Sequence, residues 1–339
     1  MTEPVSQSES RKPFRLSGSA LHKASALLTL LLLIFAFSFG NSAFLSVNNG
    51  LTVLLQTAVI GLLAIGMTLV IITGGIDLSV GSVLALSGVI AGLSIKAGIP
   101  LVPSMVLGVL TGAACGFVNG LVITKMRITP FVATLGMMLM ARGLGLQLTG
   151  AAPISRLGEA FGILGNGSFF RIVEMQPNGF PKVIFPGIPY PAVLLLVVAL
   201  IAGYVLQRRQ IGRHVFSVGS NEEAARLSGV SVIRTKVWAY TVSGALAGLS
   251  GMVLMSRLVT VQPNEGVMYE LDAIAAAVIG GASLMGGVGS ISGSMIGAFI
   301  IGVLRNGLNM AGTSAFVQQI VIGFVVIAAV YIDQVRNRK

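Results

Sequence analysis

Ten long apolar runs constrain the fold of this chain more than any other feature of its sequence. A helix needs about 20 predominantly apolar residues to cross a bilayer, and only helices and closed barrels satisfy their backbone groups in lipid. The sequence therefore predicts an all-α membrane protein with about ten transmembrane helices. The eighth and ninth runs are separated only by "GGVG", so one of them is expected to be short or broken. The runs lie at about 24–40, 51–72, 77–95, 101–123, 130–149, 189–206, 236–256, 271–287, 291–310 and 315–332.

The distribution of charge predicts which side of the membrane each loop occupies. Only 10% of the residues are charged, whereas a soluble domain carries about 25%. If the N-terminus is inside and ten helices alternate, 15 of the 22 Lys and Arg residues fall in cytoplasmic segments. This skew follows the positive-inside rule and explains the net charge of +11 without a nucleic-acid partner.

The first run has two interpretations. It follows a basic segment and ends near "NSA", so it is either a cleaved signal peptide or a retained first helix. A retained helix gives an even helix count with both termini in the cytoplasm, which fits the charges. We therefore expect residues 1–22 to be a disordered cytoplasmic tail, because they are polar and basic, and residues 23–339 to form the transmembrane domain.

Motifs for nucleotide hydrolysis, metal binding and hydrolytic catalysis are absent from the sequence. It contains no G-x-x-x-x-G-K-[ST], no H-E-x-x-H and no G-x-S-x-G. The two histidines, His22 and His214, are far apart, and the single cysteine, Cys115, lies in an apolar run. The sequence thus offers neither a metal site nor a disulfide framework. We expect the chain to have no catalytic site and to bind no cofactor itself.

Three acidic residues lie at the mouths of apolar runs. "ITGGIDLSVGSVLALSG" places Asp77 at the start of the third run, and "MYELDAIAAAVIGGASL" places Glu270 and Asp272 at the start of the eighth. Each is a helix cap, part of a polar pathway, or both. The two stretches are similar and enter the membrane from opposite sides, which indicates an inverted repeat of the kind found in transporters.

Isolated polar residues in other runs allow a similar choice. They either form hydrogen bonds between helices or contact a polar solute. Because unpaired polar groups are costly in lipid, we also expect two chains to pair and hide some of them. The positions expected at that interface are Thr134, Gln147, Asp272 and Asn306. The candidates for a translocation path are Asp77, Asn119, Phe131, Thr134, Gln147, Glu270, Asp272 and Asn306.

Two loops are long enough to carry structure of their own. The external loop, at about 150–188, is rich in Pro, Gly and aromatic residues, and its prolines argue against a long helix. The cytoplasmic loop, at about 207–235, contains "VGSNEEAARLSGV". Asn221 is expected to cap a helix of about two turns that ends at Gly229. Ala224, Ala225 and Leu227 give this helix a small apolar face, which suits either a solvated loop helix or a helix that docks into a partner.

Four stretches in order resemble the membrane permease of carbohydrate ABC importers of the ribose, arabinose and xylose type. They are "ITGGIDLSVGS", "NGLVITKMRITPFVATLGMMLMARG", "GRHVFSVGSNEEAARLSGV" and "AIAAAVIGGASLMGGVGSISGSMIGA". This family belongs to the branched-chain-type permease superfamily. The resemblance implies a type II ABC importer-like permease, located in the bacterial inner membrane, that moves a sugar or polyol.

The resemblance also implies partners. A second permease chain, identical or a sister chain, would complete the path. A cytoplasmic ATPase would use ATP, and a periplasmic or extracellular binding protein would deliver the sugar. By its motif, the segment 219–229 is the coupling helix that docks into the ATPase. The residues carried over are Gly219, Asn221, Glu222, Glu223, Ala224, Ala225, Ser228 and Gly229.

An alternative function needs no ATPase. The acids Asp77, Glu270 and Asp272 would relay protons in a secondary transporter of a small polar solute. Transport by the chain alone under a proton gradient would favour this alternative, and a strict need for ATP and a second protein would exclude it.

Overall fold

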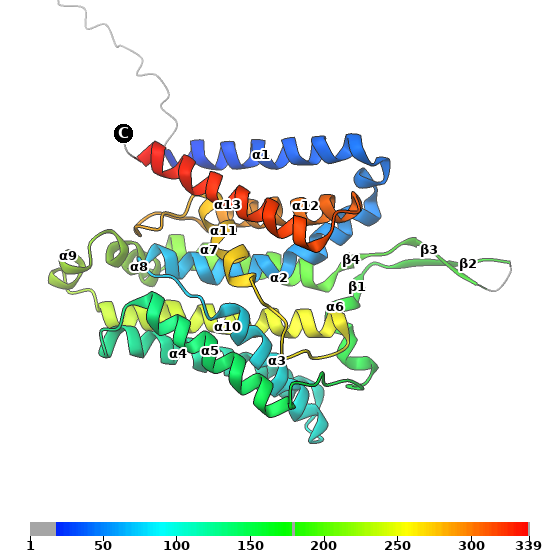
Figure 1. Ribbon diagram of the computed structural model, residues 1–339, viewed down its shortest axis with the longest axis horizontal. Coiled ribbons are helices and arrows are strands. Elements are labelled where there is room, and N and C mark those ends of the chain that lie inside the picture. Colours follow the sequence, from blue (N-terminus) through cyan, green and yellow to red (C-terminus); the bar gives the residue numbers. More distant parts are fainter. Residues whose placement is uncertain (1–17, 178–179, 338–339) are drawn as a thin grey trace, which may run out of the picture.

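The computed structural model describes residues 18–177 and 180–337. Residues 1–17 of the predicted tail lie outside the described residues, whereas 18–22 already form the start of α1 (Gly18–Gly40). The helices lie side by side along one direction (Figure 1). The short helix α9 (Glu222–Leu227) projects from one end, and the hairpin of β2 (Ile172–Met175) and β3 (Pro181–Phe185) projects from the other. The two predicted loops thus lie at opposite ends of the helix bundle.

Each of the ten predicted runs contains a helix. Among the described residues, seven helices are long and apolar enough to cross a membrane: α1, α2, α4, α5, α7, α10 and α12. The prediction of an all-α membrane protein is therefore confirmed. Beyond α1, the helices of the runs are α2 (Val47–Ile72), α3 (Val80–Lys96), α4 (Leu101–Lys125), α5 (Pro130–Thr149), α7 (Tyr190–Arg208), α10 (Val232–Leu258), α11 (Tyr269–Ile279), α12 (Ile291–Met310) and α13 (Ala315–Asn337).

The eighth run differs from its predicted extent of 271–287. The helix α11 has only 11 residues, and 280–290 form an irregular loop before α12 begins. Glycines cause this early end, because Gly281, Gly286 and Gly287 adopt φ of 90°, 86° and 73°, which side-chain-bearing residues rarely adopt. A helix of 11 residues is too short to span a bilayer, so α11 enters the bundle but does not cross the membrane.

The two halves of the bundle pack in an equivalent pattern. α10 packs against α3 and α4, and α2 packs against α11 and α12. α3 in turn packs against α4 and α5, as α11 does against α12 and α13. The pattern is unchanged when α2–α5 are exchanged with α10–α13, which supports the inverted repeat. α2 and α10 contact each other, and each packs against helices of the opposite half.

The core of the bundle lies around α2 and α10. In the most apolar 18-residue stretch of α2, 89% of the residues are buried, so this helix is surrounded by protein and not by lipid. Small residues allow α10 to approach α4 closely. A methyl group on Gly112 of α4 would lie 2.9 Å from the amide nitrogen of Gly248, and one on Gly248 would lie 2.9 Å from Val109 Cα. Close backbone approach through small residues is how membrane helices associate.

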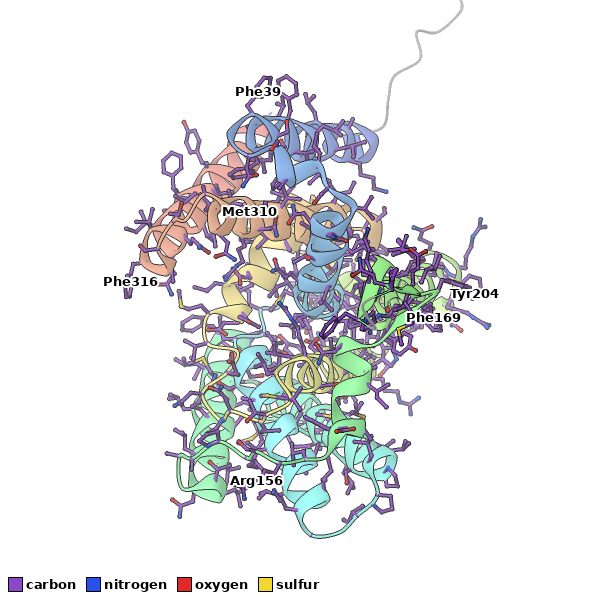
Figure 2. All side chains as sticks on the ribbon, turned by 90° about the vertical axis from the view of Figure 1, so that its right-hand side faces the viewer. Phe39, Arg156, Phe169, Tyr204, Met310 and Phe316 are labelled. Atoms are coloured by element: carbon purple, nitrogen blue, oxygen red, sulfur yellow. The ribbon has the colours of Figure 1, made fainter. Side chains whose placement is uncertain are left out.

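The external loop folds into short elements and contains no long helix, as its prolines predicted. It comprises η2 (Glu159–Gly162), α6 (Ile163–Asn166), β1 (Ser168–Phe169), β4 (Ile188–Pro189) and the β2–β3 hairpin. A single bridge between Ile154 and Val261 joins it to the loop after α10. Viewed from the hairpin end, the external loop begins beside α5, near Arg156, and crosses the bundle to the side where Phe169 lies (Figure 2).

Candidate functional site

The predicted helix in the cytoplasmic loop is present as α9. Asn221 caps it by accepting a 2.9 Å hydrogen bond from the Ala224 N–H, and Glu222 and Glu223 occupy the first turn. Ser228 is the C-cap, and Gly229 follows with φ of 84°. The sequence therefore predicted the cap and the end of this helix correctly, whereas Gly219, which was placed in the same helix, lies at the end of the preceding one. The role of α9 as a coupling helix stays a prediction.

The apolar residues of α9 do not share one face as predicted. Ala225 is 2% exposed and faces the bundle, whereas Leu227 is 82% exposed. Glu222 is held by an ion pair with Lys236, at 2.5 Å between Oε2 and Nζ. α9 therefore presents Leu227 and Glu223 outward, and it is attached to the bundle through Ala225 and Glu222. An exposed leucine on a capped helix suits a partner with an apolar groove.

A second helix, α8 (Gln210–Ser220), leads directly into α9 and was not predicted. It buries Gly212, Val215 and Val218 on one side and exposes polar residues on the other. It packs against α2, α7 and α10. α8 is thus the element that fixes α9 to the membrane-spanning helices.

Asp77 lies in the loop between α2 and α3 and is 1% exposed. Its Oδ1 accepts hydrogen bonds from the Ser79 N–H at 3.0 Å and the Ser79 hydroxyl at 2.6 Å. Its Oδ2 accepts from the Ser243 hydroxyl of α10 at 3.1 Å. Asp77 therefore holds the chain just before α3 and ties it to α10. This arrangement agrees with a structural role for Asp77 at the start of the third run, although the cap residue of α3 itself is Ser79.

Two further predicted residues adjoin Asp77. The Asn119 side-chain amide of α4 donates to the Ser79 hydroxyl at 3.0 Å. The Thr134 hydroxyl of α5 donates to the Ile76 carbonyl at 3.4 Å, and so does the Tyr240 hydroxyl of α10. The 73–79 loop is therefore attached by side-chain hydrogen bonds to α4, α5 and α10. Side chains from distant parts of the sequence converge on one short segment.

Asp272 forms a buried ion pair on α11. Its Oδ2 accepts from Arg305 Nη2 of α12 at 2.5 Å, and the Asp272 side chain is 2% exposed. The sequence placed Arg305 within a span and assigned it no role. The pair explains why a charged residue is tolerated there, because intramembrane charges are paired or face a cavity.

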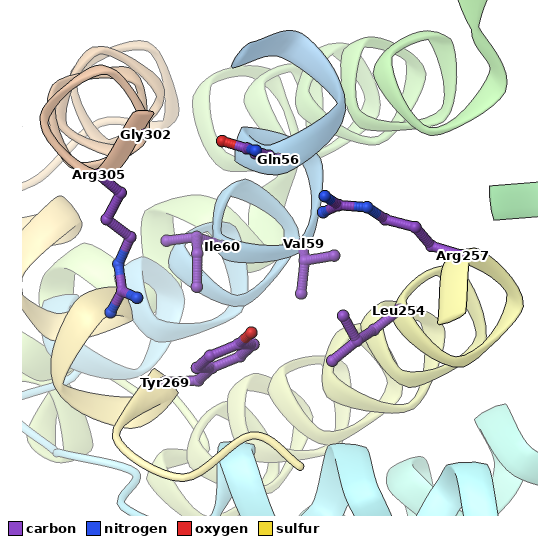
Figure 3. A pocket seen from close by; sticks show the side chains of 8 residues that line it. All are labelled: Gln56, Val59, Ile60, Leu254, Arg257, Tyr269, Gly302 and Arg305. Atoms are coloured by element: carbon purple, nitrogen blue, oxygen red, sulfur yellow. The ribbon is translucent and has the colours of Figure 1, made fainter. Parts of the chain in front are cut away.

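A pocket of about 180 Å³ adjoins Arg305 (Figure 3). Arg305 and Arg257 lie on opposite sides of it, with Gln56 and the Tyr269 ring on the other two sides. Asn166 of the external loop donates to the Arg257 carbonyl, so the pocket lies towards the end of the bundle that carries this loop. The remaining wall is formed by Val59, Ile60, Leu254 and Gly302. A pocket with guanidinium, amide and phenol groups suits a small polar solute.

The other predicted positions are distributed over the bundle. Phe131 is 55% exposed, Gln147 is also exposed, and Glu270 is half-buried. Asn306 is 3% exposed and its Oδ1 has no hydrogen-bond partner among the described residues.

The burial of these residues changes the expectation about the interface between two permease chains. Of the four positions placed there, only Gln147 is exposed. Thr134, Asp272 and Asn306 are 0%, 2% and 3% exposed within one chain. The bundle itself already hides these polar groups, so their cost in lipid is not a reason for pairing.

Arg142 of α5 is a positioning residue that the sequence analysis missed. Its Nη1 donates to the Pro263 and Glu265 carbonyls, each at 2.7 Å. It therefore holds the 259–268 loop, which leads from α10 into α11. A lone arginine in an apolar run was the available signal, since such a charge requires buried partners.

Comparison with known proteins agrees with this architecture. Residues 49–330 match the family described as the branched-chain amino acid transport system / permease component. The ribose import permease protein of Bacillus subtilis (strain 168) is 42% identical, with 94% of each chain covered. The fructose import permease protein of Rhizobium meliloti is 36% identical, covering 93% of this chain and 86% of its own. The xylose transport system permease protein of Escherichia coli (strain K12) is 34% identical, with 88% of each covered. No solved structure gives a significant match.

Proposed function

Because this chain belongs to the branched-chain amino acid transport system / permease component family, we propose that it is the membrane subunit of an ATP-driven importer for a sugar or polyol. The observation that carries the proposal is 42% identity to a ribose import permease over 94% of both chains. Similar proteins named for fructose and xylose support a monosaccharide as the substrate class, with ribose the first to test.

The energy for import comes from a separate chain in this proposal. The sequence has no P-loop, so ATP is bound and hydrolysed by a partner ATPase. α9 is the proposed coupling helix, because it is capped, exposed and attached to the bundle by Ala225. Its outward residues, Leu227 and Glu223, are the proposed contacts with the ATPase. A sugar-binding protein on the outside delivers the substrate.

The proposed arrangement in the membrane follows the charges. The chain is a multi-pass membrane protein of the bacterial inner membrane. We propose that both termini face the cytoplasm, as the Lys and Arg distribution indicates. The proposed unit contains two permease chains and two nucleotide-binding domains, so that two copies of α9 meet a two-site ATPase.

A neutral, hydroxyl-rich solute suits the polar groups of this bundle. The residues proposed for the path are mostly uncharged, and hydroxyl and amide groups can replace the hydration of a sugar. Asp272 is neutralised by Arg305, and Asp77 is held by serine donors. These contacts give both acids structural partners, which favours the sugar importer over the proton relay.

Reconstitution in proteoliposomes tests the proposal. Liposomes that contain this chain, its ATPase and its binding protein should accumulate radiolabelled ribose, another pentose or a hexose only when ATP is enclosed with the ATPase. A matched preparation with the Walker-A lysine of the ATPase replaced should show no uptake. Uptake by this chain alone under a proton gradient would contradict the proposal and support the secondary transporter.

A further inference from the structure

Four glycines bring three distant segments into backbone contact at the cytoplasmic end of the bundle. They are Gly74 in the 73–79 loop, Gly219 at the end of α8, and Gly286 and Gly287 in the 280–290 loop. We name this contact the glycine joint. It lies immediately before Asn221, the cap of α9, and immediately before the Asp77 network.

Three of the four glycines, Gly219, Gly286 and Gly287, leave no space for a side chain, whereas a methyl group on Gly74 would meet nothing within 4 Å. A methyl group on Gly219 would overlap the Ile72 carbonyl oxygen and lie 2.6 Å from the Gly287 nitrogen. A methyl group on Gly286 would lie 2.7 Å from the Gly219 carbonyl oxygen and 3.1 Å from Gly74 Cα. Real Cβ contacts are essentially never shorter than 3.0 Å, so a side chain at Gly219, Gly286 or Gly287 would push the segments apart.

A direct hydrogen bond and an apolar contact also join these segments. The Gly287 N–H donates to the Ile72 carbonyl at 2.9 Å. Ile72 is fully buried, and its side chain fills the space beside Gly289. The end of α2 is therefore attached to the 280–290 loop, and the end of α8 is packed against both. A contact made by backbone atoms cannot yield by rotating a side chain, so it transmits displacement.

Each segment of the joint leads to a different part of the candidate path. The 73–79 loop continues to Asp77, which is bonded to α10 through Ser243 and, through Ser79, to Asn119 of α4. The 280–290 loop connects α11, which carries Asp272, to α12, which carries Arg305. α8 connects to α9. A displacement of α9 that passes through α8 therefore reaches both halves of the inverted repeat at one point.

From this geometry we infer that the glycine joint couples α9 to the two short helices α3 and α11. When the ATPase moves α9, the end of α8 displaces the 73–79 and 280–290 loops together. This inference rests on the proposed function of α9 and specifies the residues through which its motion reaches the path. The four glycines are positioning residues, because none of them is proposed to touch the sugar.

Alanine substitutions with matched controls test the joint. Gly219→Ala adds one methyl group within a helix, and its control, Gly203→Ala in α7, adds the same group where nothing lies within 4 Å. Gly287→Ala combines a clash with a φ of 73°, and its control, Gly312→Ala, has a φ of 70° and open space. The controls separate the effect of the contact from helix propensity and backbone strain.

The readout is coupling in the complete complex in proteoliposomes. Coupling is measured in both joint variants, and Gly287→Ala, which lies outside the proposed coupling helix, should still co-purify with the ATPase and hydrolyse ATP at the basal rate. Stimulation of hydrolysis by the sugar-loaded binding protein, and uptake with it, should fall about tenfold, within the range of couplings between distant sites. The two controls should behave as wild type. Wild-type coupling in both joint variants would overturn the inference.

Hydrogen–deuterium exchange on the wild-type complex gives a second test that needs no variant. Trapping the ATPase with ATP and vanadate should change exchange in 73–79 and 280–290 together, because both loops move with α8. Protection of 222–227 with no change in either loop would contradict the joint. Absence of ATP-dependent uptake by the wild-type complex would instead contradict the proposed function. Wild-type uptake in both Gly219→Ala and Gly287→Ala would contradict only the joint.

Discussion

The ion pair between Asp272 and Arg305 makes a prediction about stability that depends on which partner is removed. The Asp272 side chain is 2% exposed and that of Arg305 is 36% exposed. In Arg305→Met, the Asp272 carboxylate loses its only hydrogen-bond partner among the described residues and keeps a buried charge. Removing one partner of a buried pair costs about 3–5 kcal/mol, and we expect about 3 kcal/mol here. In Asp272→Leu, the guanidinium left behind reaches solvent, so we expect only about 1–2 kcal/mol.

The double variant Asp272→Leu/Arg305→Met removes both charges and leaves none unpaired. Replacing a buried pair by apolar residues is often neutral, so the double variant should be within about 1 kcal/mol of the wild type. The two single losses together are about 4–5 kcal/mol, so the double-mutant cycle should give a coupling energy of at least about 3 kcal/mol.

Reversible unfolding in mixed micelles measures these free energies without sugar. The fluorescence of Trp238, the single tryptophan, reports on α10, which packs against the core. Because Arg305 also lines the pocket, uptake is not the readout. Additive losses in the double variant, or a larger loss for Asp272→Leu than for Arg305→Met, would refute the reasoning.

Three further predictions concern the loops. Asp77→Asn keeps an oxygen acceptor for Ser79 and should retain most uptake, whereas Asp77→Leu leaves buried donors unpaired and should cost about 3 kcal/mol of unfolding free energy in micelles; a folded but inactive Asn variant would indicate that the charge itself is needed. Glu223→Lys reverses an exposed charge on α9, so expression should be normal and ATP-dependent uptake should fall about fivefold, within the usual range of coupling effects; unchanged uptake would exclude a contact there with the ATPase. Arg142→Gln should release the 259–268 loop and raise its amide exchange rate about tenfold, measured by mass spectrometry; an unchanged rate would mean that the two hydrogen bonds do not hold the loop.

The helices of the apolar runs and the short helix α9 were the most predictable parts of this protein. Apolar runs predict spans because the bilayer imposes a minimum length on each of them. Asn221 and Gly229 predict the ends of α9 because the capping and left-handed positions select those residue types locally. The inverted repeat was also visible, since Asp77 and Asp272 lie in similar local sequences.

Features that depend on which helices touch were not predictable in the same way. Arg305 and Arg142 lie in apolar runs, and the sequence does not show that their partners are Asp272 and the 259–268 carbonyls. The burial of Thr134 and Asn306 depends on the same unseen contacts. α11 ends just before glycines with positive φ, and the contacts of Gly286 with Gly219 and of Gly287 with Ile72 are likewise not visible in the sequence. The pattern of a single sequence shows helical periodicity and capping residues, but it does not show which distant residues contact one another.

Because α2 and α10 each pack against helices of the opposite half, the order of synthesis affects how this protein folds. α2 is made early, but the helices that cover it, α10, α11 and α12, are made last. It is also highly apolar, with a mean hydropathy of 2.3, so it is stable as a membrane span before those helices are made. α10, with a mean hydropathy of 1.4, enters a membrane that already contains its partners α2, α3 and α4. The N-terminal half therefore cannot complete its own core, and the chain becomes a compact protein only after its C-terminal helices have been inserted.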